Sequence, residues 1–471
     1  MKNMKKMNVK NILRTGSLIV AVCGLLMTTM VQASALPCTE KMTSVKNEIC
    51  AEGDYDNWEG VSNVSQFLGA NGELCFAYDN KKNVTVIKTQ NGTPEKKGIS
   101  LQKKASVFGA IACDKDGNYY VVTGKKNKTD DTTKETVFIS KYDKTGKLIA
   151  TVGDNGSSSL AYYYDSSFYT KAPFEGGTCD IAVKGDYLAV NYARHMYSGH
   201  QSNSLFLINV KTMEKVQVSE KYYNSHSFAQ RVVPFGNGFL LASEGDCYDR
   251  AFTVSTVTGL LDNNNSLSAE CNSQNIFDFW ISKGAFARYD MYEVNNNFAH
   301  MGGIAVGGEN NVSLVATSVP SLNSKAKKEK EQLFIQIFNP FADLESGEGF
   351  VTSGTRSGMA GNNGDESVTN YGVKWLTNYG KEYTISNPQV VATDKGDYVI
   401  LFERYKKNKY QGVYEIVVDK TGKVVKTTTR VSAKAYLNPY RMPVYAKGKV
   451  WWVGNNAKNE KNNVYIYSFS A

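Results

Sequence analysis

Residues 179–208 read CDIAVKGDYLAVNYARHMYSGHQSNSLFLI and contain the pattern that decides the fold. Apolar and polar side chains alternate over residues 179–184, Gly185-Asp186 marks a turn, and residues 187–190 are apolar again. Such alternation on both sides of a Gly-containing turn predicts a β-hairpin. The apolar run Leu205–Ile208 then predicts a third strand, so the stretch indicates a small antiparallel sheet.

The same hairpin pattern recurs along the chain, with starts near residues 64, 108, 176, 226, 301, 387 and 438. Two of these units also share Asp-Lys-Thr-Gly-Lys, at Asp143–Lys147 and Asp419–Lys423, between apolar runs. This sequence predicts a tight turn that joins a third strand to a fourth. A repeated four-stranded unit is typical of a propeller blade, so we predict an all-β, seven-bladed β-propeller. A β-sandwich is the rival architecture, but it explains the repeated unit less well.

The last unit ends at its third strand, Val464–Tyr467, and so lacks a fourth. We expect the N-terminal segment 36–60, with Cys38 and Cys50, to supply the closing strand, with the residues after Cys50 as the natural donor. Closure would remove a free sheet edge and bury the apolar faces of the first and last blades. The propeller would then span residues 61–471, with loop insertions near 251–300 and 341–386.

Residues 1–35 have the pattern of a signal peptide. Five basic residues precede an apolar run from Ser17 to Val31, and Ala33-Ser34-Ala35 forms a small-residue cleavage site. The apolar run is shorter than the roughly 20 residues that span a bilayer. We therefore expect a secreted, extracellular protein, with no integral membrane segment after cleavage and in monomeric form.

The charge balance points away from nucleic acid as a partner. The formal net charge of the chain is +9, and it falls to +4 when the five basic residues of the signal segment are subtracted. Lys and Asp are interspersed along the rest of the chain, without a strongly basic region. No pattern for a metal site or a cofactor site is present, so we expect neither.

Eight cysteines are present, and seven of them follow the signal segment. A secreted protein permits disulfides, and an odd number leaves at least one thiol without an intramolecular partner. Cys38 with Cys50 is the preferred pair, because it closes a short loop, and Cys247 with Cys271 is the second. Cys75, Cys113 and Cys179 fit equally well as small buried thiols.

The chain resembles a secreted bacterial β-propeller of the broad WD, kelch and NHL-like class. The repeats at Asp143–Lys147 and Asp419–Lys423 carry this resemblance, which covers most of residues 60–471. The stretches Tyr192–Asn203, Ser225–Arg231 and Val373–Tyr379 also resemble motifs of a poorly characterised family of propellers in Gram-positive gut bacteria. The resemblance implies the fold and no particular activity.

Candidate functional residues gather around the central units. The loops there carry Arg194, His195, His200, His226, Arg231, Asp246 and Arg250, and His300 follows. In one hypothesis, His200 and His226 act as acid and base, with His300 as a further candidate. Arg194 and Arg231 would then hold an anionic group, and Asp246 would orient a histidine. In the other, most of these residues connect blades by hydrogen bonds.

Taken together, these features favour a secreted binding or interaction module for a glycan or protein ligand. The alternative is a secreted hydrolase, lyase or transferase that uses a His/Arg cluster at the channel mouth. Long propeller loops commonly carry binding residues, which adds Trp280 and Trp375 from the two insertions to the candidates. The identity of the ligand lies beyond the sequence.

Overall fold

The computed structural model describes residues 38–44, 60–160, 165–245, 251–260, 268–279, 299–308, 310–321, 329–360, 366–454 and 463–471. All of them belong to one compact unit, Leu36–Ala471. The expected signal peptide 1–35 lies outside the described residues. In the described part of the chain, no helix has the length and apolar character needed to span a bilayer.

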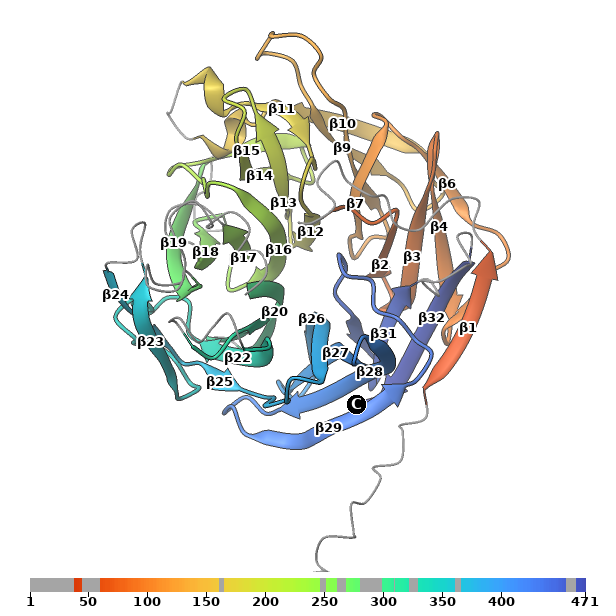
Figure 1. Ribbon diagram of the computed structural model, residues 1–471. Helices are drawn as coiled ribbons and strands as arrows, with labels where there is room; N and C mark the ends of the chain where they lie inside the picture. Colours follow the sequence, from red (N-terminus) through yellow and green to blue (C-terminus); the bar gives the residue numbers. More distant parts are fainter. Residues whose placement is uncertain are drawn as a thin grey trace, which may run out of the picture. The chain divides into compact units, whose positions relative to one another are not determined.

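Seven blades, each with four main antiparallel strands, make up the described part of this unit, and Figure 1 shows their inner strands around a common centre. The outer strands of blades 3 and 4 pair in parallel at residues 217–218 and 268–269, which joins these two blades into one nine-stranded sheet. Blades 1 to 4 contain these strands: β2 Val64–Leu68, β3 Leu74–Asn80, β4 Asn83–Gln90, β5 Thr93–Pro94 and β6 Ile99–Gln102; β7 Val107–Cys113, β8 Tyr119–Gly124, β9 Val137–Tyr142 and β10 Leu148–Asp154; β11 Thr170–Pro173, β12 Cys179–Lys184, β13 Tyr187–Met196, β14 Gln201–Asn209 and β15 Glu214–Val218; β16 Ser227–Phe235, β17 Gly238–Gly245, β18 Ala251–Thr258 and β19 Ser268–Asp278.

Blades 5 to 7 contain the remaining strands: β20 Ala299–Gly308, β21 Asn311–Ser318, β22 Gln332–Phe338 and β25 Lys374–Trp375; β26 Tyr383–Ala392, β27 Tyr398–Lys406, β28 Lys409–Val418 and β29 Val424–Ser432; β30 Val444–Ala446, β31 Lys449–Gly454, β32 Asn463–Ser470 and β1 Thr39–Ser44. Two 3-10 turns, η2 Ser157–Ser159 and η3 Ser166–Phe168, lie between blades 2 and 3 in sequence. The fold is a seven-bladed β-propeller.

Apolar side chains fill the space between neighbouring blades, because each strand sends alternate residues to opposite faces of its sheet. On β31, Val450 and Trp452 pack with strands of blade 6, whereas Trp451 and Val453 pack with strands of blade 1. Each of the seven core clusters joins two adjacent blades in this way. Alternate residues of one strand therefore pack against the two neighbouring blades.

The ring is closed, as the sequence predicts. The inner strands contact one another in the order β2, β7, β12, β16, β20, β26 and β30, and β30 returns to β2. The fourth strand of blade 7 comes from the N-terminal segment: β1 pairs with β32, from Thr39 opposite Ser468 to Ser44 opposite Asn463. The closing strand thus precedes Cys50, and the expectation that the donor follows Cys50 is wrong.

The two Asp-Lys-Thr-Gly-Lys sequences form matching turns. Asp143 Oδ1 accepts hydrogen bonds from the backbone N–H groups of Thr145 at 2.8 Å and Lys147 at 3.0 Å. Asp419 Oδ1 accepts the equivalent two bonds, both at 2.9 Å. These turns join β9 to β10 and β28 to β29, which confirms the predicted link between third and fourth strands.

The two predicted insertions contain more regular structure than expected. Residues 251–258 and 268–278 are β18 and β19, the outer strands of blade 4, and not part of a loop. In the second insertion, β23 Thr355–Ala360 pairs with β24 Glu366–Tyr371 as a separate hairpin. The prediction of a loop insertion near 251–300 is therefore wrong for residues 251–258 and 268–278, which belong to blade 4.

The described cysteines Cys38, Cys75, Cys113, Cys179 and Cys271 are free thiols. Burial raises the pKa of Cys38 to about 11 and that of Cys271 to about 12. Their predicted partners, Cys50 and Cys247, lie outside the described residues. The structure shows no disulfide among the residues it describes, and the two pairings stay predictions.

Removal of β1 should weaken the ring. A chain that begins at residue 45 exposes the edge of β32, whereas a chain that begins at residue 36 keeps β1. We expect the shorter chain to unfold at least about 5 °C lower in thermal denaturation followed by circular dichroism. Equal midpoints for the two chains would show that β1 contributes nothing to closure.

Candidate functional site

The resemblance motifs in residues 192–203 and 225–231 meet at one end of blade 3. The turn 197–200 joins β13 to β14, and it lies beside η3, because Ser198 donates to the Ser167 carbonyl at 3.0 Å. On the other side of this hairpin, His226 N–H donates to the Gln201 carbonyl at 2.8 Å. We call η3, the turn 197–200 and the segment 221–226 the blade 3 tip.

Two aromatic rings and a lysine form a contact group on the blade 3 tip. The Phe168 and Tyr223 rings meet edge to face with centroids 5.0 Å apart. Lys221 Nζ lies 3.8 Å from the Phe168 centroid and 4.9 Å from that of Tyr223. Both rings are half-buried and Lys221 is exposed. Partial burial lowers the pKa of Lys221, and the nearby Asp165 opposes that shift.

His200 and His226 form a stacked pair on the same tip. Their ring centroids are 5.1 Å apart with the planes 20° from parallel, and His200 Nδ1 lies 3.1 Å from His226 Nε2. One of these two nitrogens donates the hydrogen to the other. His200 is exposed, and His226 holds a left-handed backbone with φ of 46°, which is uncommon outside glycine.

The other two histidines contact carboxylates instead. His195 Nδ1 lies 3.2 Å from Glu175 Oε2, and the other oxygen of Glu175 lies 3.1 Å from Lys126 Nζ. His300 Nε2 lies 3.7 Å from Glu331 Oε1. Burial raises the pKa of Glu331, and His300 opposes this. The contacts therefore divide the four histidines into three groups.

Arg194 lies under the blade 3 tip and is fully buried. Its Nε donates to Ser202 Oγ at 3.0 Å and its Nη1 to Thr170 Oγ1 at 3.4 Å, while Nη2 has no hydrogen-bond partner among the described residues. Burial lowers the pKa of Arg194. A Cβ at Gly156 would lie only 2.5 Å from Arg194 Nη1, so glycine is required there. Arg194 thus supports the tip from inside.

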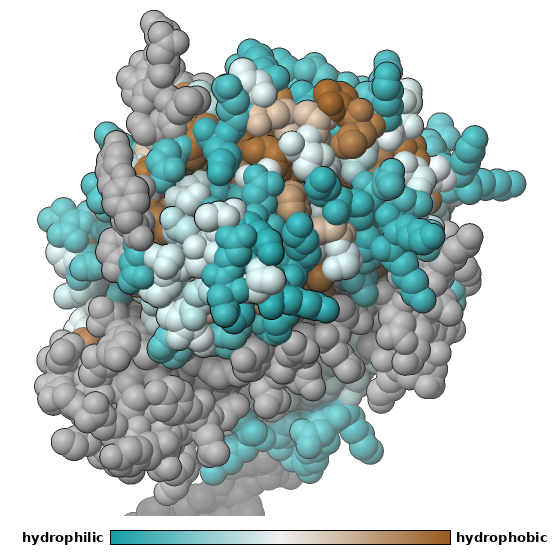
Figure 2. Space-filling model, turned by 90° about the horizontal axis from the view of Figure 1, so that it is seen from above, coloured by the Kyte–Doolittle hydropathy of each residue, from teal (hydrophilic) through white to brown (hydrophobic). Residues whose placement is uncertain are grey.

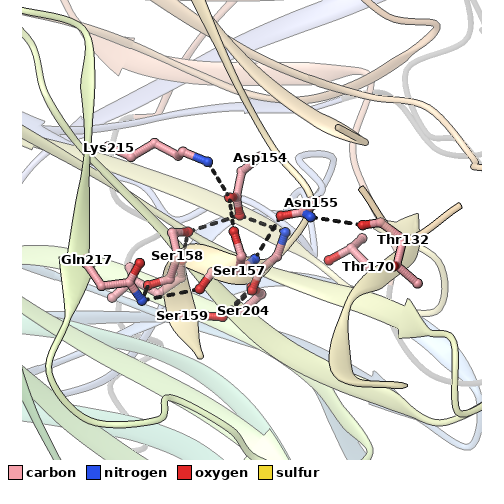
Figure 3. A network of polar contacts seen from close by, with 12 residues as sticks. Thr132, Asp154, Asn155, Ser157, Ser158, Ser159, Thr170, Ser204, Lys215 and Gln217 are labelled. Carbon is pink, nitrogen blue, oxygen red and sulfur yellow. Dashed lines mark hydrogen bonds and ion pairs between the residues drawn. The ribbon is translucent and has the colours of Figure 1, made fainter. Parts of the chain in front are cut away.

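A second buried group, centred on Asp154 at the end of β10, connects blade 2 to blade 3 (Figure 3). Asp154 accepts hydrogen bonds from Gly156 N–H at 2.8 Å and Ser158 Oγ at 3.0 Å, and Lys215 Nζ lies 3.4 Å away. Neighbouring bonds join Ser159 Oγ to Ser204 Oγ and Gln217 Nε2 to the Ser158 carbonyl. This network fixes η2, which hydrogen-bonds to the base of the tip through Ser159 and Tyr222.

Arg231 belongs to a different set of buried polar residues, which links the inner strands around the centre. Arg231 Nε donates to the Gly302 carbonyl at 3.3 Å, from blade 4 to blade 5. Gln389 Nε2 donates to the Asn438 carbonyl at 2.6 Å, and Asn438 Nδ2 donates to Ser62 Oγ at 2.8 Å. Arg441 Nη1 donates to the Cys179 carbonyl at 2.5 Å, and its Nη2 donates to the Gly109 carbonyl. We call these residues the central girdle.

The remaining predicted site residues fall elsewhere. Trp375 lies in the short strand β25, where its ring packs edge to face on Phe334 in blade 5. Asp246, Arg250 and Trp280 lie outside the described residues. Among the described residues, no three His, Cys, Asp or Glu side chains are grouped as in a metal site.

Several residues of these sites were not found from the sequence. Phe168 and Tyr223 lie 55 positions apart and carry no shared motif, so only the fold brings them together. The position of Arg441 in the sequence could have identified it. Arg441 directly precedes a predicted inner strand, and Arg231 begins another. Two arginines at such starts indicate side chains that reach the centre of the ring.

No family model matches the chain, and no curated protein matches it. Among solved structures, the chain is similar to the N-terminal domain of Nup159, with a TM-score of 0.38 and 9% identity over 92% of this chain and 98% of that one. A polysaccharide lyase, ulvan lyase, has a TM-score of 0.38 at 10% identity over 72% of this chain and 77% of that one. The α-L-arabinanase of Cellvibrio cellulosa has a TM-score of 0.28 at 9% identity, with 66% and 91% covered. These likenesses say nothing about activity.

Asp154→Ala should destabilise the protein by about 2 to 4 kcal/mol, because it leaves several buried donors without their acceptor. The free energy of unfolding from urea denaturation measures this loss. Asp130→Ala is the matched control: Asp130 is 97% exposed and pairs with Lys171 at 3.7 Å, so its loss should cost less than about 1 kcal/mol. Equal effects would show that the Asp154 network does not support the fold.

Proposed function

We propose that this protein is a secreted binding module that holds an extracellular glycan on the blade 3 tip. The signal segment 1–35 supports secretion. The observation that carries the proposal is the contiguous group of Phe168, Tyr223 and Lys221 beside the stacked His200–His226 pair.

The chemistry of this group suits a sugar. Aromatic rings can stack on the C–H faces of sugar rings, and a sugar that stacks on the faces under Lys221 Nζ would displace that ammonium group. Lys221 and the imidazole nitrogens offer donors and acceptors for hydroxyl groups, and Lys221 would also attract an anionic substituent. A protein ligand that presents an acidic and apolar surface could use the same groups, and it is the alternative within this proposal.

The blade 3 tip is also held in place before a ligand arrives. The Asp154 network fixes η2, Arg194 connects Ser202 to Thr170, and Asp165 Oδ1 caps η3 by accepting from Ser167 N–H at 2.9 Å. Binding groups fixed by buried hydrogen bonds lose less conformational entropy when a ligand binds. Elsewhere among the described residues, six large apolar residues are exposed, and only Leu148 and Ile149 of them are neighbours in one strand. In Figure 2 the hydrophobic areas are small and separate.

A secreted hydrolase, lyase or transferase is the second candidate. The His200–His226 contact at 3.1 Å favours it, because two imidazoles in contact can pass a proton near neutral pH. Of the proposed anion-holding residues, Arg194 is buried under the tip and hydrogen-bonds to the protein itself, and Arg231 belongs to the central girdle, whose residues are not part of the blade 3 tip. His300 contacts Glu331 in blade 5, so the described part of the tip offers the enzyme hypothesis the histidine pair alone.

A glycan array probed with residues 36–471 tests the proposal. Phe168→Ala and Tyr223→Ala should each weaken binding of the best glycan about tenfold or more, because each removes a stacking surface. Phe341→Ala is the matched control, since Phe341 is a 55% exposed aromatic residue in blade 5. An array without signal, or one that these tip variants leave unchanged, would contradict glycan binding at the blade 3 tip.

The same array separates binding from catalysis. Mass spectrometry of the bound glycans should show no chemical change if the protein only binds them. Conversion of a glycan that stops in His200→Asn but continues in Phe341→Ala would establish the enzyme instead. A silent array with capture of an extracellular protein that Tyr223→Ala abolishes would establish the protein ligand.

A further inference from the structure

A cavity of about 440 Å³ lies at the centre of the ring, and all seven blades line it. This volume falls in the range of small-molecule sites. Most of the wall is apolar: Phe67 and Ile111 come from blades 1 and 2, and Val233 and Ile304 from blades 4 and 5. The cavity is distinct from the blade 3 tip, none of whose residues line it.

Charge in the cavity is confined to one end. Asp180, Arg231 and Arg441 are the charged residues that line it. The arginines donate to Gly302, Cys179 and Gly109, which lie in the first halves of the inner strands. Arg231 and Arg441 therefore cover the end of the cavity at which the inner strands begin. Met442, which follows Arg441, also lines the cavity, and a Cβ on Gly303 would lie 2.3 Å from its Sδ.

The opposite end is reached by solvent. Val306 and Ala392 line the cavity near the last residues of β20 and β26, and both are partly exposed. A ligand can therefore enter from this end with its apolar part along the wall. Its leading group would then face the arginines.

The charged end carries an excess of one positive charge, since two guanidinium groups face a single carboxylate. Arg231 is 2% exposed and Arg441 is 5% exposed, and neither makes an ion pair among the described residues. Asp180 instead accepts hydrogen bonds from the N–H groups of Val232 and Ile181, each at 3.0 Å. Arg441 Nε has no hydrogen-bond partner in the described part of the chain. Buried charge that is not compensated is costly, and an anion at this end would compensate it.

We propose that the central cavity binds a small molecule with one anionic group, such as a carboxylate, on an apolar body. The single excess charge selects a monoanion, and the Val- and Ile-rich wall selects the apolar body. Because the wall of the cavity has a low dielectric, the attraction between the anion and the two guanidinium groups is stronger there than on the surface.

Calorimetric titration of residues 36–471 with three probes of equal chain length tests this. Decanoate should bind saturably, decanol at least about tenfold more weakly, and decylamine without detectable heat. Equal binding of decanoate and decanol would overturn the role of the arginines. Failure of decanoate to bind saturably would overturn the site.

Variants then locate the probe. Ala392→Phe places a ring in the cavity and should abolish decanoate binding, whereas Ala150→Phe, at a similarly exposed alanine on the outer strand β10, should not. Asp180→Asn removes the one negative charge and keeps one of the two oxygens that accept from Val232 N–H and Ile181 N–H. If its thermal midpoint matches that of the unchanged protein, it should tighten decanoate binding several-fold. Unchanged binding in Ala392→Phe, or weaker binding in Asp180→Asn, would contradict the proposal.

Arg441→Gln should weaken decanoate binding, but it also removes bonds to two blades. If thermal denaturation shows that the Arg441→Gln variant does not fold, the Ala392→Phe and Asp180→Asn variants decide whether decanoate binds in the cavity. Phe168→Ala, which lies in the blade 3 tip, should leave decanoate binding unchanged. The test of the cavity can therefore succeed or fail separately from the test of glycan binding at the blade 3 tip.

Discussion

The free edge of each inner strand is the constraint on which this structure depends. The strands of each blade pair from the inside outward, and the outer strands β15 and β19 of blades 3 and 4 also pair with each other in parallel. The inner strand of a blade therefore presents one row of backbone N–H and C=O groups toward the centre. Unpaired groups of this kind are costly when buried. Side chains near the centre satisfy some of them: Thr178 Oγ1 accepts from Gln230 N–H at 2.6 Å, Arg231 donates to the Gly302 carbonyl, and Arg441 donates to carbonyls of two blades. Polar bonds thus hold the ring at its centre, and apolar clusters hold it between blades.

This constraint explains why the polar motifs of blade 3 divide between interior and surface. On β13, Tyr192, Arg194 and Met196 point to one side of the sheet and are buried, while His195 points to the other and is partly exposed. From the sequence, Arg194 is expected in a loop, whereas the structure places it inside β13, where neighbouring residues on both faces are buried. The sequence does not reveal its partners either, because Thr170 and Ser202 reach Arg194 only through the pairing of β11, β13 and β14.

The sequence predicts the blades well, since each hairpin is local and carries its own turn signal. It is wrong about the closing strand and about the outer half of blade 4. β1 reads TEKMTS and β19 reads SAECNSQNIFD, and neither shows a strong apolar alternation, so neither is recognisable as a strand. β18 reads AFTVSTVT and is more apolar, yet it falls in the same predicted insertion as β19. The pairing of Thr39 with Ser468 depends on a contact across almost the whole chain.

Departures from ordinary local rules occur in many blades, and some of them lie in the two proposed sites. Under and on the blade 3 tip, Arg194 keeps a nitrogen without a partner among the described residues, and His226 holds a left-handed backbone that brings its ring onto His200. In the central cavity, two buried guanidinium groups face one carboxylate. Natural sequences usually avoid such costs, and where they accept them the reason is commonly function. The two regions are built differently, one as a half-buried aromatic surface and the other as an apolar cavity that is open at one end and charged at the other, so they should select different ligands.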